Sequence, residues 1–131
     1  MASLLLAACA SPQSENRENP QLFHVLSESD LSINMQAMAD RIAVLSLFAL
    51  DDTLSAQQKQ DKVVPLLNSI ELIASELDQG GAVTNYSVIN RYMGAFLYDV
   101  AMARRLAMAE RPDFLPAQRL IKSCLSCHAA I

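Results

Sequence analysis

Glycine, tryptophan and basic stretches are scarce in this chain. Its 131 residues include three glycines and no tryptophan, and 52% of them are hydrophobic. This composition favours helices over strands, and no strand pattern is visible. The formal net charge is −4, and no basic stripe offsets phosphate repulsion, which argues against a nucleic-acid partner. The length is that of one domain.

Enzyme signatures are missing as well. The chain has no Gly-rich phosphate loop, and no Ser/His/Asp set remains once His128 is given the role described below. Because these signatures are missing, we expect a protein that is not an enzyme.

The apolar run at the front of the chain is too short to span a bilayer.

One stretch near the end of the sequence carries recognisable chemistry. Residues 124–128 read Cys-Leu-Ser-Cys-His, the C-x-x-C-H signature of c-type haem attachment. The thiols of Cys124 and Cys127, about one helical turn apart, can add to the two porphyrin vinyl groups as thioethers. The imidazole of His128 then binds iron as the proximal ligand. The motif predicts one covalently bound haem c.

Two other interpretations of the same motif stay open. Half of a zinc site would need a second Cys/His pair, but the remaining candidates, Cys9 and His24, are single residues. A redox dithiol of the thioredoxin type would lie in a βαβ context, and this chain shows no strand pattern.

The front of the chain is similar to a bacterial lipoprotein signal. Residues 1–9 end in Leu-Ala-Ala-Cys, the form of a lipobox, in which the cysteine becomes the lipidated N-terminus. Haem attachment in bacteria also requires export from the cytoplasm. No Lys or Arg precedes the short apolar run, so either the true start lies upstream or the similarity is accidental. We expect lipidation at Cys9, a flexible tether at 10–21, and a periplasmic location on the outer membrane.

Four segments of the remaining chain have helical periodicity. Their apolar residues recur in steps of three and four, as in the inner stripes of a packed bundle. The stripes are Leu31, Met35, Met38, Ile42, Leu45 and Ala49; Val63, Leu67, Ile70, Ala74 and Leu77; Tyr86, Ile89, Met93, Phe96, Val100, Ala103 and Ala107; and Ala117, Leu120, Cys124, Cys127 and Ile131.

Local signals set the expected ends of these helices. Ser29 or Asp30 should cap the first helix, and Ser55 with Gln58 forms a capping box for the second. The third helix should run from about 85 or 86 to about 110. Asp113 should cap the fourth helix. Further signals are Pro65, expected to kink or split the second helix, and the stop at 78–81.

These features predict an all-α fold over residues 22–131, an antiparallel up-down-up-down four-helix bundle joined by short linkers. A bundle that carries C-x-x-C-H on its last helix resembles the class II c-type cytochromes, which include cytochrome c′ and low-spin, methionine-ligated relatives. The resemblance implies haem near one end of the bundle and a sixth iron position that faces the first helix. Bundle dimers are common in that family, although no residue of this chain specifies a homodimer.

The sixth ligand has several candidates. In an antiparallel bundle, the end of the last helix lies level with the start of the first. Met35 lies about 8–9 Å along the first helix and Met38 roughly one turn deeper. We predict Met35 as the ligand and keep Met38, an open iron and His24 as alternatives. A methionine on such a stripe otherwise serves as core filler.

The expected function is single-electron transfer with redox partner proteins through a His/Met-ligated haem. One alternative is a cytochrome c′-like protein that binds nitric oxide or carbon monoxide at an open or displaceable sixth position. Another is a haem lipoprotein subunit of a membrane redox complex.

Overall fold

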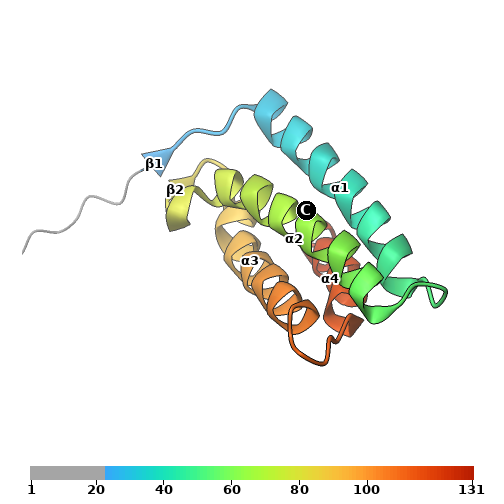
Figure 1. Cartoon of the computed structure of the whole chain (residues 1–131). Helices are drawn as coiled ribbons and strands as arrows, with labels where there is room; N and C mark the ends of the chain where they lie inside the picture. Colours follow the sequence, from blue (N-terminus) through green and yellow to red (C-terminus); the bar gives the residue numbers. More distant parts are fainter. Residues whose placement is uncertain (1–22) are drawn as a thin grey trace, which may run out of the picture.

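Four α-helices dominate the computed structural model, which describes residues 23–131 (Figure 1). They are α1 (Glu28–Leu50), α2 (Ala56–Asp78), α3 (Ser87–Ala107) and α4 (Leu115–His128). The prediction of an all-α fold is confirmed. The predicted lipidation at Cys9 and the tether at 10–21 lie outside the described residues.

Two very short strands accompany the helices. β1 (Phe23–His24) pairs in parallel with β2 (Val83–Thr84), and a 3-10 turn, η1 (Gln79–Gly81), links α2 to β2. The prediction of a chain without strands was therefore wrong in this detail. Each strand has two residues, too few to show alternation in a sequence.

The caps of the first two helices follow ordinary side-chain chemistry. Ser27, rather than Ser29 or Asp30, caps α1, and its hydroxyl accepts a hydrogen bond from the Asp30 amide. The capping box of α2 is confirmed, because Ser55 and Gln58 bond each other's backbone amides. α2 ends at Asp78, followed by left-handed Gln79 and two glycines with positive φ, as the stop signal predicted.

Pro65 does not split the second helix. α2 is continuous for 23 residues with Pro65 inside it, and this proline is exposed. The buried residues of α2 lie on both sides of it, Val63 before and Leu67 after. Packing of this shared inner face keeps the helix continuous despite the lost backbone donor.

The last two helices are shorter than expected. α3 begins at Ser87 and ends at Ala107 rather than near 110. α4 starts after Phe114, not Asp113, although the Asp113 carboxylate accepts a hydrogen bond from the Leu115 amide. α4 ends at His128, and Ile131, predicted on its inner stripe, is 84% exposed. That prediction was wrong because the helix ends before this residue.

The core is formed by the predicted stripes of all four helices. One cluster joins the buried apolar residues of α1, α2 and α3 to Ala117 and Leu120 of α4 and to Leu26, which precedes α1. The outer side of α1 keeps Ile33, Leu47 and Leu50 exposed. By length and composition, α1 could also cross a membrane.

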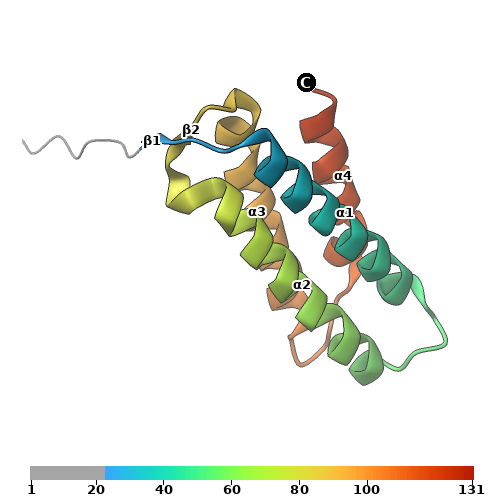
Figure 2. The same cartoon turned by 90° about the horizontal axis from the view of Figure 1, so that it is seen from above.

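Side chains tie the helices together at the end remote from the chain's C-terminus. The Ala49 carbonyl, at the end of α1, accepts hydrogen bonds from Lys59 of α2 and Gln118 of α4. Gln60 donates to the Ala107 carbonyl at the end of α3. The end of α1 and the starts of α2 and α4 therefore lie together, as do the start of α2 and the end of α3 (Figure 2).

The segment before α1 is fastened at the opposite end. The side-chain amide of Asn85 accepts a hydrogen bond from the Leu26 amide at 2.7 Å and donates to the Leu26 carbonyl at 3.0 Å. Beside it, Asn90 binds both the backbone and the hydroxyl of Thr84. The chain before α1 is thus fixed against the start of α3.

Replacing Asn85 by Ala should release this segment. Both backbone groups of Leu26 lose their partner, which should lower the free energy of unfolding by about 1–3 kcal/mol. Chemical denaturation measures this loss. The control is Gln57→Ala, which removes one exposed hydrogen bond to Asp61 and should change stability little. An equal loss in both variants would contradict the role of Asn85.

Candidate functional site

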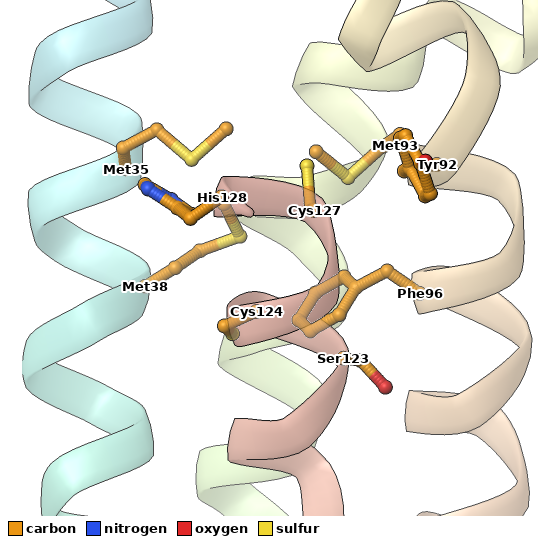
Figure 3. Close-up of a pocket in the computed structure, with 9 residues that line it drawn as sticks. All are labelled: Met35, Met38, Tyr92, Met93, Phe96, Ser123, Cys124, Cys127 and His128. Atoms are coloured by element: carbon orange, nitrogen blue, oxygen red, sulfur yellow. The ribbon is translucent and has the colours of Figure 1, made fainter. Parts of the chain in front are cut away.

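The C-x-x-C-H motif occupies the last turns of α4, beside the first half of α1 and the start of α3 (Figure 3). Side chains from these three helices line a cavity of about 40 Å³. Its lining residues are Met35, Met38, Tyr92, Met93, Phe96, Ser123, Cys124, Cys127 and His128. The cavity brings together the predicted residues Met35, Cys124, Cys127 and His128.

A larger groove runs along the same seam between α1 and α4. Its volume is about 320 Å³, and its walls include Ala39, Ala43 and Ile121. Met35, Met38, Cys124 and His128 line the groove as well as the inner cavity. These four side chains therefore form the boundary between the two spaces. Among residues 23–131, no Asp, Glu, Lys or Arg side chain lines either space.

The two candidate methionines lie one turn apart on α1, and both project toward His128 in Figure 3. Met38 is 5% exposed, whereas Met35 is only partly buried against the core. The thioether of Met35, partly buried at the wall of the groove, contributes less to core packing than that of Met38. His24, the remaining candidate ligand, lies in β1 opposite Thr84 and lines neither space.

Sequence reasoning missed part of the lining. Met93 and Phe96 were assigned to the inner stripe of the third helix and not to the site, and Tyr92 and Ser123 were not assigned at all. The positions of these residues along their helices could have identified them, because the start of α3 lies level with the end of α4 when the two helices are antiparallel. Ser123 also donates a hydrogen bond to Asp99 of α3.

The two thiols are in a partly desolvated environment. Burial raises the pKa of Cys124, and the neighbouring thiol of Cys127 adds to this rise. Burial also raises the pKa of Cys127. Redox-active dithiols have the opposite property, a lowered pKa that supplies a thiolate near neutral pH. The pair is therefore poorly suited to thiol–disulfide exchange.

Alkylation should report these raised pKa values in protein whose cysteines are free. A raised pKa keeps each thiol protonated at neutral pH, so the rate with iodoacetamide should rise at higher pH in the folded protein than in denaturant. Rates measured across pH, with the denatured chain as control, test this. Faster alkylation of the folded protein at neutral pH would favour a redox dithiol.

The donor atoms at this site are chiefly soft. Thioethers, thiols and an imidazole line the cavity, and such donors suit iron or copper better than magnesium or calcium. Within residues 23–131, no group of three or more His, Cys, Asp or Glu side chains is arranged to hold a metal ion. The described part of the chain thus supplies no second Cys/His pair for a zinc site.

Taken together, the site is a C-x-x-C-H motif that faces two methionines across an uncharged seam between α1 and α4. His128 and both methionines line the cavity and the groove together. Comparisons of this chain with protein-family models, with curated proteins and with solved structures found no match in any of the three.

Proposed function

We propose that this protein is a c-type cytochrome that transfers single electrons through one covalently bound haem. Cys124 and Cys127 would hold the haem as thioethers, and His128 and Met35 would bind its iron. The observation that carries the proposal is the position of the motif, which faces Met35 and Met38 across a seam without charged side chains. The proposal agrees with the resemblance of the sequence to class II c-type cytochromes.

The proposed architecture is an antiparallel up-down-up-down four-helix bundle with haem near one end. The hydrogen bonds of Ala49 and Ala107 support it, because they join the end of one helix to the start of another. Leu26 and Asn85 support it at the other end, where they tie the start of α1 to the start of α3. Short connections between neighbouring helices favour the same topology.

The residues of the seam fit a porphyrin in chemistry. Met93, Phe96 and Tyr92 offer apolar and aromatic surface on the α3 side, and Ile121 and Ala43 do so at the groove. The cavity is about 40 Å³ and the adjoining groove about 320 Å³, so most of the space available to a porphyrin lies along the groove between α1 and α4.

When bound, haem supplies a ferric/ferrous couple. As a neutral ligand, an imidazole from His128 favours neither oxidation state of iron by its charge. A thioether from Met35 favours ferrous iron and so raises the reduction potential. The apolar residues of the seam would reduce the contact of a bound ring with water, which would limit reorganisation when the charge changes. The helices hold both ligands on rigid elements.

The groove favours a second candidate function, the binding of nitric oxide or carbon monoxide. Met35 is only partly buried and lines a groove of about 320 Å³. A weakly bound or absent sixth ligand would give a small gas molecule access to iron. Binding of carbon monoxide by the wild-type ferrous protein would favour this function.

Two measurements on the exported protein test the proposed function. The denatured polypeptide should carry the mass of one haem, and visible spectra of the oxidised and reduced protein should both be low spin. Haem that extracts into acidified organic solvent would overturn covalent attachment. A high-spin spectrum would overturn the closed His/Met site and favour gas binding.

The location follows as a separate proposal. We propose that Cys9 is lipidated and anchors the protein to the periplasmic face of the outer membrane, where it acts alone or as a subunit of a membrane redox complex. Mass analysis of the mature N-terminus should find an acylated Cys9, and Cys9→Ser should release the protein from the membrane fraction. A mature chain that starts elsewhere would contradict this.

A further inference from the structure

Charge is unevenly distributed between the two ends of the four helices. The end that carries His128, here called the site end, comprises the first two turns of α1 and α3 and the last two turns of α2 and α4. It has four carboxylates, Glu28, Asp30, Glu76 and Asp78, against two cations, Arg91 and Lys122. The opposite end has five carboxylates and six cations within the same two turns and their loops.

Exposed apolar side chains occur at both ends of the helices: Leu50 and Met108 lie at the opposite end, and three lie at or beside the site end. Leu125, within the motif on α4, is 63% exposed, Ile33 on α1 is 64% exposed and Val25 before α1 is 68% exposed. His128 is also exposed. The nearest charge to Leu125 along α4 is Lys122, and the four carboxylates lie at the site end of α1 and α2. An end surface that combines apolar side chains with charged residues is typical of contact surfaces between proteins.

We propose that the site end docks a redox partner protein whose contact surface has an apolar centre and a basic rim. This inference rests on the proposed electron transfer and adds the chemistry of the partner. The carboxylates attract and orient the partner, and Leu125 contacts it beside the haem. Such complexes are small and short-lived, because electron carriers must dissociate after each transfer.

The same charges disfavour other occupants. A second copy of this chain, docked through the same surface, would bring the four carboxylates of each copy together. A membrane with anionic lipids would repel the four carboxylates. A basic protein gains from both the charge and the apolar contact.

The test compares two double variants that change the net charge equally. Glu28→Gln with Glu76→Gln neutralises the site end, and Asp52→Asn with Glu110→Gln neutralises the opposite end; all four side chains are exposed. The measurement is the rate of electron transfer from the reduced protein to a lysine-rich soluble c-type cytochrome at low ionic strength. The site-end variant should be roughly three- to tenfold slower, and the control should change less than about twofold.

A second pair tests the apolar contact. Leu125→Asn should slow transfer to the protein acceptor, whereas Leu47→Asn, on the exposed side of α1 and similarly exposed at 70%, should not. Both leucine variants should keep their visible spectra and their rates with hexacyanoferrate, a small acceptor that needs no docking surface. If the wild-type protein has no haem spectrum, the proposed function itself is wrong.

Several results would overturn the docking proposal without contradicting the proposed cytochrome function. Equal slowing by both charge variants would mean that only the net charge matters. A Leu125→Asn variant as fast as Leu47→Asn would remove the apolar contact. A wild-type dimer in sedimentation that Leu125→Asn dissociates would identify a second copy as the occupant.

Discussion

Joint replacement of Cys124 and Cys127 by alanine is expected to abolish covalent haem attachment completely. Both thioether bonds need these sulfurs, and the described residues supply no other cysteine. Each single replacement should leave one bond and retain covalent haem. The double variant should be recovered largely without haem, because a His/Met pair alone has no covalent hold. Mass spectrometry of the denatured chains measures the difference.

Ser126→Ala is the matched control for this experiment. Ser126 lies between the two cysteines, is exposed, and bonds only the Lys122 carbonyl of its own helix. The variant should carry haem like the wild type. Covalent haem in the double cysteine variant, or its loss from Ser126→Ala, would contradict the assigned roles.

Replacing Met35 by Leu should convert the iron from almost wholly low spin to almost wholly high spin. The sulfur ligand is lost, so the potential should fall and ferrous iron should bind carbon monoxide. Leu has a similar volume, and the change should cost under about 1.5 kcal/mol of stability. Visible spectra, redox titration and chemical denaturation measure the three effects.

Met38→Leu is the control, because it changes the same chemistry one turn away. Met38 is almost fully buried, so the variant should alter stability slightly and leave the iron low spin. If Met38→Leu gives the high-spin protein and Met35→Leu does not, Met38 is the ligand. If both variants stay low spin, neither sulfur alone is required.

Most of the fold could be predicted because the hydrophobic pattern is regular. Ile42, Leu45, Val100 and Ala103 are fully or almost fully buried, as their three- and four-residue spacing predicted. The motif residues line one cavity with Met35, as expected if the end of the last helix lies level with the start of the first. Helix ends were less predictable, since several polar residues near each end compete for the capping position. Ser27 competes in this way with Ser29 and Asp30.

The rest of the site depends on how the helices align along their axes. Tyr92 and Phe96 contribute to the cavity because α3 starts at Ser87, and a shift of one turn would place other residues there. Loop conformation sets this alignment, including the pairing of β1 with β2 and the hold of Asn85 on Leu26. Such long-range contacts leave no periodic signal in a sequence.

The proline inside α2 also has a consequence for how the protein opens. Pro65 has no amide hydrogen, so the backbone ladder of α2 is interrupted between its first and second halves. The half before the proline buries Val63, whereas the half after it buries Leu67, Ile70, Ala74 and Leu77. Local unfolding should therefore start in residues 56–64, and their amides should exchange with deuterium sooner than those of 67–77.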